Sequence, residues 1–134
     1  NSKCKKVYSN EINREANKYA KMNIELNNLK NKIELLPGDV KRVAVDLKKK
    51  KFDVIIMPRP QLKETFLKQA FALSKKGTRI FYYDFCKLGE EKKIIDKIKQ
   101  EAKKSKKRIK ILKKKKAGEI APFKIRLRVD LVVE

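Results

Sequence analysis

The sequence predicts an α/β fold, with a doubly wound and mostly parallel sheet that ends in a C-terminal antiparallel hairpin. First, four apolar residues at 54–57 lie between lysines and the proline-rich 58–60 loop, which is typical of a central strand buried on both faces of a parallel sheet. Second, strand-like and helix-like segments alternate along most of the chain. Third, the last two strand-like segments follow each other with only Gly118 and Pro122 as breakers between them, as in a hairpin.

Short-range patterns define the first four elements. Residues 5–9 read as a strand, and residues 14–27 carry apolar side chains at an approximately helical period. Residues 33–36 form a second strand, which a Pro-Gly pair ends. Asp39 follows as a candidate N-cap of a short helix through residue 46.

The later elements follow the same reasoning. After the strand at 54–57, residues 62–74 place apolar side chains near one face of a helix, with Gly77 as its expected C′ residue. The remaining elements are an apolar strand at 79–85, a highly charged helix at 90–104 and the alternating hairpin strands at 108–113 and 123–133.

The charge of the chain predicts an anionic partner. The 134 residues suffice for one domain with a modest core, and they carry 38 Lys+Arg against 16 Asp+Glu, a formal charge of +22. Lysine-rich surfaces also occur in thermophilic proteins, but there acidic residues tend to match them in number. The imbalance therefore favours nucleic acid as the partner.

The cysteines and the hydropathy of the chain further limit the kinds of protein that it can be. Cys4 and Cys86 are far apart in the sequence and the chain has no histidine, so no common zinc pattern is present and no metal is expected. No apolar run reaches the ~18 residues of a membrane span, and no signal peptide opens the chain. We therefore expect no membrane partner and a reduced, cytoplasmic location.

Two acidic residues follow expected strands. In nucleotide-binding α/β folds, an acidic residue after the second strand accepts hydrogen bonds from ribose hydroxyls, which makes Glu11 a candidate. Asp39 follows the next strand, in a loop where a carboxylate can accept the amine of an adenine ring. Each position is also typical of a helix cap, and for Glu11 taken alone the cap is the favoured interpretation. For Asp39 the two roles are compatible, because a carboxylate has several acceptor sites.

Three further features are candidates for contact with a nucleic acid. Arg59 offers a fork of donors to a phosphate or a purine edge, although Pro-x-Pro is more often only a rigid turn. The stretch 103–116, which is dense in Lys and Arg and includes the lysines at 113–116, is a candidate for phosphate contact, with a solvated charged helix end and hairpin as the alternative. Tyr82 and Tyr83 point to opposite faces of a strand, so one belongs to the core and the other is a candidate pocket residue.

In this order the elements resemble the Rossmann-like domain of class I S-adenosylmethionine-dependent methyltransferases. The detailed similarity is to archaeal tRNA (guanine-N1) methyltransferases, which modify guanosine 37. It rests on Val7-Tyr8-Ser9-Asn10-Glu11-Ile12-Asn13, Gly38-Asp39-Val40, the 52–60 segment, the 77–83 segment, Ala121-Pro122 and Asp130.

The resemblance implies both a cofactor and a substrate. It implies that S-adenosylmethionine is bound by Glu11, Ile12, Asp39, Val40 and Pro58. It also implies that Pro58, Arg59 and Pro60 form the catalytic loop that positions the base. The RNA partner is then tRNA, with Arg59, Lys113, Lys114, Lys115 and Lys116 as its expected contacts.

Two departures from the family pattern matter. Pro58 stands where the family usually has Asn, which removes a side-chain amide from the substrate loop. Nothing before Lys5 supplies the family's first strand and glycine-rich turn. The resemblance therefore implies that residues 1–134 are a partial methyltransferase domain, which by itself is a candidate for an inactive fragment.

The implied reaction transfers a methyl group to N1 of guanosine 37. That nitrogen carries a proton at neutral pH, so the reaction needs a base or an electrostatic aid, together with alignment of the two reactants. Two alternatives stay open. One is transfer of an aminocarboxypropyl group from the same cofactor, as in the wybutosine pathway. The other is a non-catalytic basic RNA-binding module with a decayed cofactor site.

Overall fold

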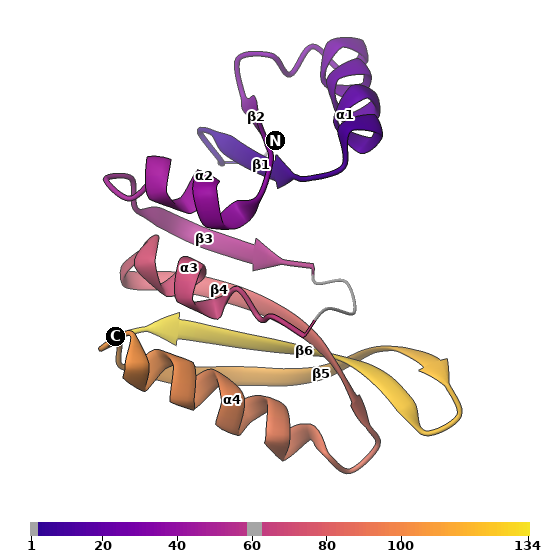
Figure 1. Ribbon diagram of the computed structural model, residues 1–134, viewed down its shortest axis with the longest axis vertical. Coiled ribbons are helices and arrows are strands. Elements are labelled where there is room, and N and C mark those ends of the chain that lie inside the picture. Colours follow the sequence, from indigo (N-terminus) through magenta and orange to yellow (C-terminus); the bar gives the residue numbers. More distant parts are fainter. Residues whose placement is uncertain (1–2, 59–62) are drawn as a thin grey trace. The chain divides into compact units, whose positions relative to one another are not determined.

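The computed structural model describes residues 3–58 and 63–134 (Figure 1). It divides into two compact units, Asn1–Leu47 and Lys48–Glu134. The described residues contain no helix that is long and apolar enough to cross a membrane.

The first unit is a β-α-β-α segment. Strand β1 (Val7–Glu11) pairs in parallel with β2 (Ile33–Pro37), so that Val7 lies opposite Ile33 and Glu11 opposite Pro37. Helix α1 (Arg14–Leu26) connects the two strands, and α2 (Val40–Asp46) follows β2. Since both strands run in the same direction, their carboxyl ends lie at the same edge.

Side-chain caps begin both helices of this unit. Asn13 Oδ1 accepts hydrogen bonds from the backbone N–H groups of Glu15 and Ala16, at 2.8 and 3.1 Å. Asp39 Oδ1 accepts one from the N–H of Lys41 at 2.8 Å. A cap of this kind is worth about 1 kcal/mol, and it fixes where the chain turns from strand to helix.

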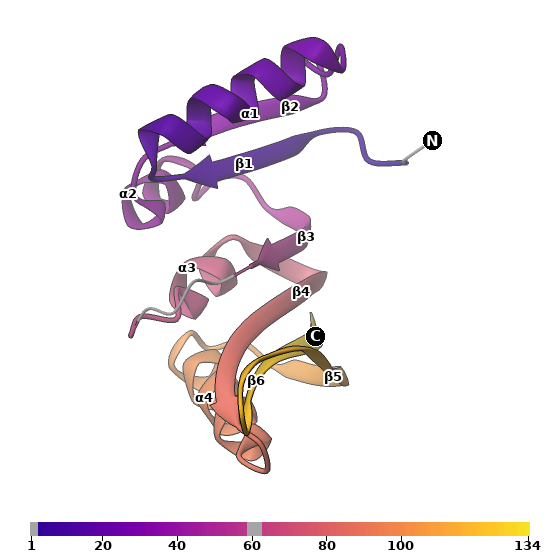
Figure 2. The ribbon, with the colours of Figure 1, turned by 90° about the vertical axis from the view of Figure 1, so that its right-hand side faces the viewer.

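The second unit is a four-stranded mixed sheet with strand order β3-β4-β6-β5. Its strands are β3 (Phe52–Met57), β4 (Ser74–Lys87), β5 (Ile109–Ala121) and β6 (Lys124–Val133). The β3–β4 pair is parallel, whereas β6 is antiparallel to both of its neighbours. Helices α3 (Leu67–Ala72) and α4 (Glu91–Lys104) lie on the same side of this sheet (Figure 2).

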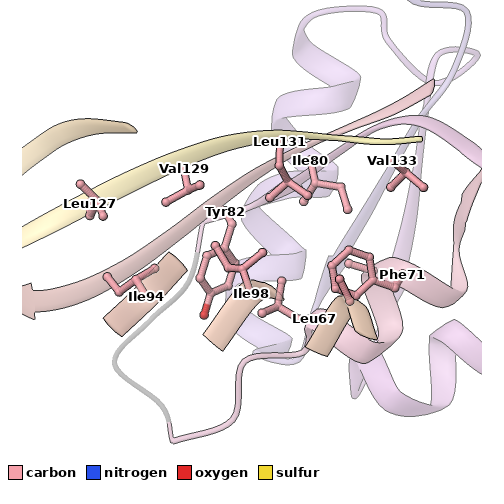
Figure 3. Close-up of a cluster of buried hydrophobic side chains, with 12 residues drawn as sticks. Leu67, Phe71, Ile80, Tyr82, Ile94, Ile98, Leu127, Val129, Leu131 and Val133 are labelled. Carbon is pink, nitrogen blue, oxygen red and sulfur yellow. The ribbon is translucent and has the colours of Figure 1, made fainter. Parts of the chain in front are cut away.

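The core of the second unit lies between those helices and the sheet (Figure 3). In β6 the odd-numbered residues from Ile125 to Val133 are buried, because successive side chains of a strand point to opposite faces. In α4 the buried residues Ile94, Ile98 and Ala102 recur every four positions and so share one face. Each large apolar side chain buried there contributes about 1.5–3 kcal/mol.

The expected α/β class, with parallel strand pairs and a closing antiparallel hairpin, is confirmed. Three details were wrong. The helix expected at 62–74 spans only Leu67–Ala72 among the described residues, and Gly77 lies inside β4 rather than after a helix. Its φ of +87° shows that glycine serves an irregular position of the strand there.

The third error concerns the strand at 54–57, which the sequence placed at the centre of a sheet. Within the second unit β3 is an edge strand that pairs with β4, and Val54 and Ile56 are exposed. Ile55 and Met57 point to the other face and pack against the core. The continuous apolar run therefore has one buried and one exposed face in this unit.

The packing predicts that Ile98→Ala lowers the free energy of unfolding of the second unit by about 2–5 kcal/mol, because Ile98 is completely buried. Leu112→Ala is the matched control, since that side chain is 44% exposed and should change stability by less than about 0.5 kcal/mol. Urea unfolding followed by circular dichroism measures both. Equal losses would contradict the assigned core.

Candidate functional site

The carboxyl ends of β1 and β2 bring the two expected acidic residues to one edge of the first unit. Asn10 lies opposite Leu36, and Glu11 opposite Pro37, so the two strands end together. Asp39 follows after one further residue, Gly38. In open α/β sheets this edge is where ligands bind.

Backbone and amide hydrogen bonds join the two strand ends. Asn10 Nδ2 donates to the carbonyl oxygens of Leu36 and Gly38, at 2.7 and 2.9 Å. The N–H of Gly38 donates to the carbonyl oxygen of Glu11 at 2.9 Å. Gly38 has a φ of +119°, a value that favours glycine. The loop that carries Asp39 is therefore tied to the end of β1.

Glu11 is held by the turn into α1. Its Oε1 accepts a hydrogen bond from the N–H of Asn13 at 2.8 Å. Asn17 Nδ2 donates to the carbonyl oxygen of Glu11 at 2.9 Å and to that of Asn13 at the same distance. These bonds fix the backbone on both sides of the carboxylate.

Both carboxylates keep acceptor capacity for a ligand. Glu11 uses Oε1 for the turn and Asp39 uses Oδ1 for the cap, and within the described part of the chain their second oxygens accept no hydrogen bond. Next to them, Ile12 is exposed and Val40 is half-buried. Two free carboxylate oxygens beside apolar side chains suit a neutral ligand with hydroxyl or amine donors and a flat apolar surface.

The described residues include no group of three or more Cys, Asp or Glu side chains that could hold a metal ion.

The expected catalytic loop is described in part. Pro58 is exposed and directly follows β3, whose last residue Met57 packs against the core of the second unit. Arg59 and Pro60 lie outside the described residues. Pro58 therefore lies at the carboxyl end of a strand that pairs in parallel, as the sequence predicted for this residue.

The four lysines at 113–116 do not form one surface. In the register of β5 with β6, Lys113 and Lys115 lie opposite Asp130 and Arg128, on the face away from the helices. Lys114 and Lys116 point to the helix side, where Lys116 Nζ lies 2.7 Å from Glu119 Oε2. The run is thus divided between two faces.

Tyr82 and Tyr83 have the two different environments that their alternation requires. Tyr82 is buried in the core, and its hydroxyl donates to Asp84 Oδ2 at 2.8 Å (Figure 3). Lys97 Nζ lies 3.2 Å from the same oxygen. Tyr83 lies on the opposite face, with the Arg126 guanidinium 4.7 Å from its ring centroid.

Sequence reasoning missed the surface around Tyr83. We define the open face as the side of β4 and β6 away from α3 and α4, which carries Phe81, Tyr83, Phe85, Arg126 and Arg128. The guanidinium groups of Arg126 and Arg128 lie over these rings. The signal was present as aromatic residues at 81, 83 and 85 and basic residues at 124, 126 and 128, both with the period of a strand.

Arg128 is also paired with a carboxylate. Its Nε lies 2.8 Å from Asp130 Oδ1, and its Nη2 donates to Asp130 Oδ2 at the same distance. Hydrogen bonds to Asp130 and Tyr83 raise the pKa of Arg128 above its ordinary value, so it stays charged. The pair neutralises the acidic residue that this part of the open face contains.

Cys86 is unsuited to nucleophilic chemistry. Burial, together with the negative charges of Glu91, Asp84 and Glu90, raises the pKa of its thiol. A raised pKa means less of the reactive thiolate at neutral pH.

We therefore predict that iodoacetamide labels Cys86 more slowly than exposed Cys4 at pH 7. The rate at Cys86 should begin to rise at a higher pH than that of an ordinary thiol, because its deprotonation is displaced upward. Mass spectrometry of the Cys4→Ser and Cys86→Ser variants measures each site alone. Faster labelling of Cys86 at pH 7 would show that its thiol is activated.

Comparison with known proteins identifies the family to which this architecture belongs. Residues 1–112 match the model of the TRM5/TYW2 methyltransferase domain. Among solved structures, Trm5b from Pyrococcus abyssi is 28% identical with a TM-score of 0.83, and the match covers 97% of this chain and 38% of that one.

Two further structures contain bound partners. Methanocaldococcus jannaschii TYW2 in complex with AdoMet is 27% identical with a TM-score of 0.83, over 97% of this chain and 58% of its own. The complex of aTrm5 with tRNALeu is 29% identical with a TM-score of 0.80, over 97% and 35%. This chain thus spans less than two thirds of each of these proteins. Since the domain model covers most of its residues, the chain belongs to the TRM5/TYW2 methyltransferase domain family.

Proposed function

We propose that this chain belongs to a catalytic domain that methylates tRNA with S-adenosylmethionine, at N1 of guanosine 37. The observation that carries the proposal is the pair of carboxylates at the joined carboxyl ends of β1 and β2, in a chain of this family. A structural relative was solved with AdoMet and another with tRNALeu, which supports the same cofactor and partner here.

In this proposal the adenosine part of the cofactor lies along the edge of the first unit. The free Glu11 oxygen accepts from the ribose hydroxyls, and the free Asp39 oxygen accepts from the adenine amine. Ile12 and Val40 give the apolar contact that a flat ring needs. When bound, S-adenosylmethionine supplies an electrophilic methyl group.

The 58–60 loop would position the target base. Pro58 fixes its own φ and restricts the residue before it, so the backbone leaving β3 is stiff. We assign Pro58, Arg59 and Pro60 to alignment of the base with the methyl donor, and not to removal of the N1 proton. Alignment of this kind is a large part of catalysis in group transfer.

A specific observation supports one alternative. The TYW2 structure matches this chain as well as Trm5b does, with a TM-score of 0.83 in both cases and identities of 27% and 28%. An aminocarboxypropyl transferase of the wybutosine pathway therefore remains the second candidate. Mass spectrometry of treated tRNA distinguishes the two, because the added groups differ in mass.

We expect Asp39→Asn and Glu11→Gln each to weaken S-adenosylmethionine binding at least about tenfold, because each loses a charge-assisted hydrogen bond to the ligand. Asparagine caps helices as well as aspartate does, so α2 should persist. In either amide the remaining oxygen can keep the local bond, and the new NH₂ group then faces a ligand donor. Isothermal titration calorimetry of the full-length protein measures the affinities.

The matched control is Glu34→Gln, which removes an exposed carboxylate of β2 that lies 3.2 Å from Lys6 Nζ. It should leave the affinity for S-adenosylmethionine unchanged. Wild-type affinity in both Asp39→Asn and Glu11→Gln would remove the basis of the proposed cofactor site.

The lysine run makes a separate prediction about tRNA. The double substitution Lys113→Gln/Lys115→Gln should make the dependence on salt less steep. The negative slope of the logarithm of the tRNA-binding constant against the logarithm of the salt concentration should decrease in magnitude by about 2. The Lys114→Gln/Lys116→Gln pair should reduce it less, because Lys116 is paired with Glu119 and Lys114 lies near Glu91. Filter binding of a tRNA transcript at several salt concentrations measures the slopes. Equal slopes for the two pairs would argue against preferential tRNA binding by the lysines that lie on the side of the sheet away from the helices.

A further inference from the structure

Two turns meet at one end of the sheet of the second unit. The β5–β6 turn lies at the end of its hairpin opposite the carboxyl terminus (Figure 1). The N–H of Leu88, in the turn after β4, donates to the carbonyl oxygen of Phe123 at 2.8 Å. We call Leu88, Ile120 and Phe123, with Lys87 and Lys124, the hairpin end.

The hairpin end exposes apolar side chains. Phe123 is 74% exposed, Leu88 57% and Ile120 45%. An aromatic ring in this position gains little from the fold, whereas an occupant that covered it would remove apolar surface from water.

Phe123 also has an unfavourable backbone conformation. Its φ is +59°, in the left-handed region where glycine or asparagine costs less. Both its exposure and its conformation disfavour phenylalanine for stability alone. Residues kept at such a cost concentrate at functional sites.

The charge around this ring favours a polyanion. Lys87 and Lys124 lie opposite each other in the register of β4 with β6. Among the carboxylates of neighbouring residues, Glu119 lies 2.7 Å from Lys116 Nζ and Glu90 lies 2.6 Å from Lys93 Nζ, while Glu91 Oε1 accepts a hydrogen bond from the N–H of Gly89. An exposed aromatic ring flanked by lysines is typical of surfaces that bind unpaired nucleotides.

The register also relates the hairpin end to the catalytic loop of the proposed function. The last residue of β3, Met57, lies opposite Tyr82, and β4 continues to Lys87. At about 3.3 Å per residue, the hairpin end lies roughly 16 Å beyond the end of β3 in the direction of its carboxyl end. An RNA that places its target base at Pro58 therefore needs to extend only about this distance further to contact the hairpin end.

We propose that Phe123 stacks on an unpaired nucleobase of the substrate RNA, while Lys87 and Lys124 contact the phosphates on either side of it. This rests on the proposed function, because it takes RNA as the substrate. The hairpin end thereby contributes to the choice of a single-stranded RNA region, and the strained backbone of Phe123 is the structural cost of presenting the ring.

Two substitutions of one residue separate stacking from folding. Phe123→Gly removes the ring and relieves the backbone strain, so it should weaken binding of a tRNA transcript about tenfold while thermal stability stays equal or rises. Phe123→Trp, which keeps an aromatic ring at this position, should bind tRNA as tightly as the wild-type protein does. Leu112→Ala, which removes another exposed apolar side chain from the same hairpin, is the control and should bind as the wild type does.

Affinities are measured by filter binding with the full-length protein, for the tRNA and for a fully paired RNA duplex of similar length. Phe123→Gly should leave the affinity for the duplex unchanged, because a duplex offers no unstacked base. Lys87→Gln with Lys124→Gln should reduce the salt slope by about 2 for tRNA.

The stacking proposal is overturned if Phe123→Gly binds tRNA as tightly as the wild-type protein does, or if it loses equal affinity for tRNA and for the duplex. Either result rejects only this inference when the wild-type protein itself binds S-adenosylmethionine and methylates tRNA. Wild-type protein that binds neither S-adenosylmethionine nor tRNA would reject the proposed function as well.

Discussion

Both units depend on the parallel pairing of two strands that a helix connects. Parallel pairing requires the strands to end at the same edge, and this constraint brings Glu11 of β1 next to the loop that carries Asp39 after β2. In the second unit the same constraint aligns β3 with β4, so that Pro58 follows β3 at a defined level of the register. The backbone hydrogen bonds of the strands thus bring residues that are separated in sequence to one edge.

In the proposed function, each of the two acidic residues serves both the fold and the ligand. Glu11 and Asp39 each use one carboxylate oxygen to accept a hydrogen bond from a local backbone N–H, and the other oxygen stays available for a ligand. The local bond fixes the orientation of the carboxylate before any ligand arrives, which lowers the entropic cost of binding. Asn10 adds rigidity, because its amide joins the end of β1 to the loop after β2. In this account capping and ligand binding support each other.

Local patterns in the sequence predicted most elements and the Asp39 cap of α2, because caps and strand breakers act within a few residues. The cap of α1 was missed, since Asn13 and not Glu11 accepts the hydrogen bonds from the first helical N–H groups. They failed where distant contacts decide. The run at 54–57 looks buried on both faces, but only pairing with β4 shows which side chains meet the core. The alternation of lysines at 113–116 was visible in the sequence, yet the bulges of β5 determine which of them face Arg128 and Asp130. The open face and the hairpin end went unnoticed, since each combines residues of β6 with residues of β4.

The most direct test of the account is hydrogen–deuterium exchange of the full-length protein with and without saturating S-adenosylmethionine. Ligand contact with the Glu11 and Asp39 carboxylates should slow exchange at the amides of residues 11–13 and 38–41, where the two strand ends are joined. Amides of β5, a strand of the second unit with no proposed contact to the cofactor, should exchange as before. Saturated protein that shows no added protection at 11–13 and 38–41 would contradict the assignment of this edge as the cofactor site.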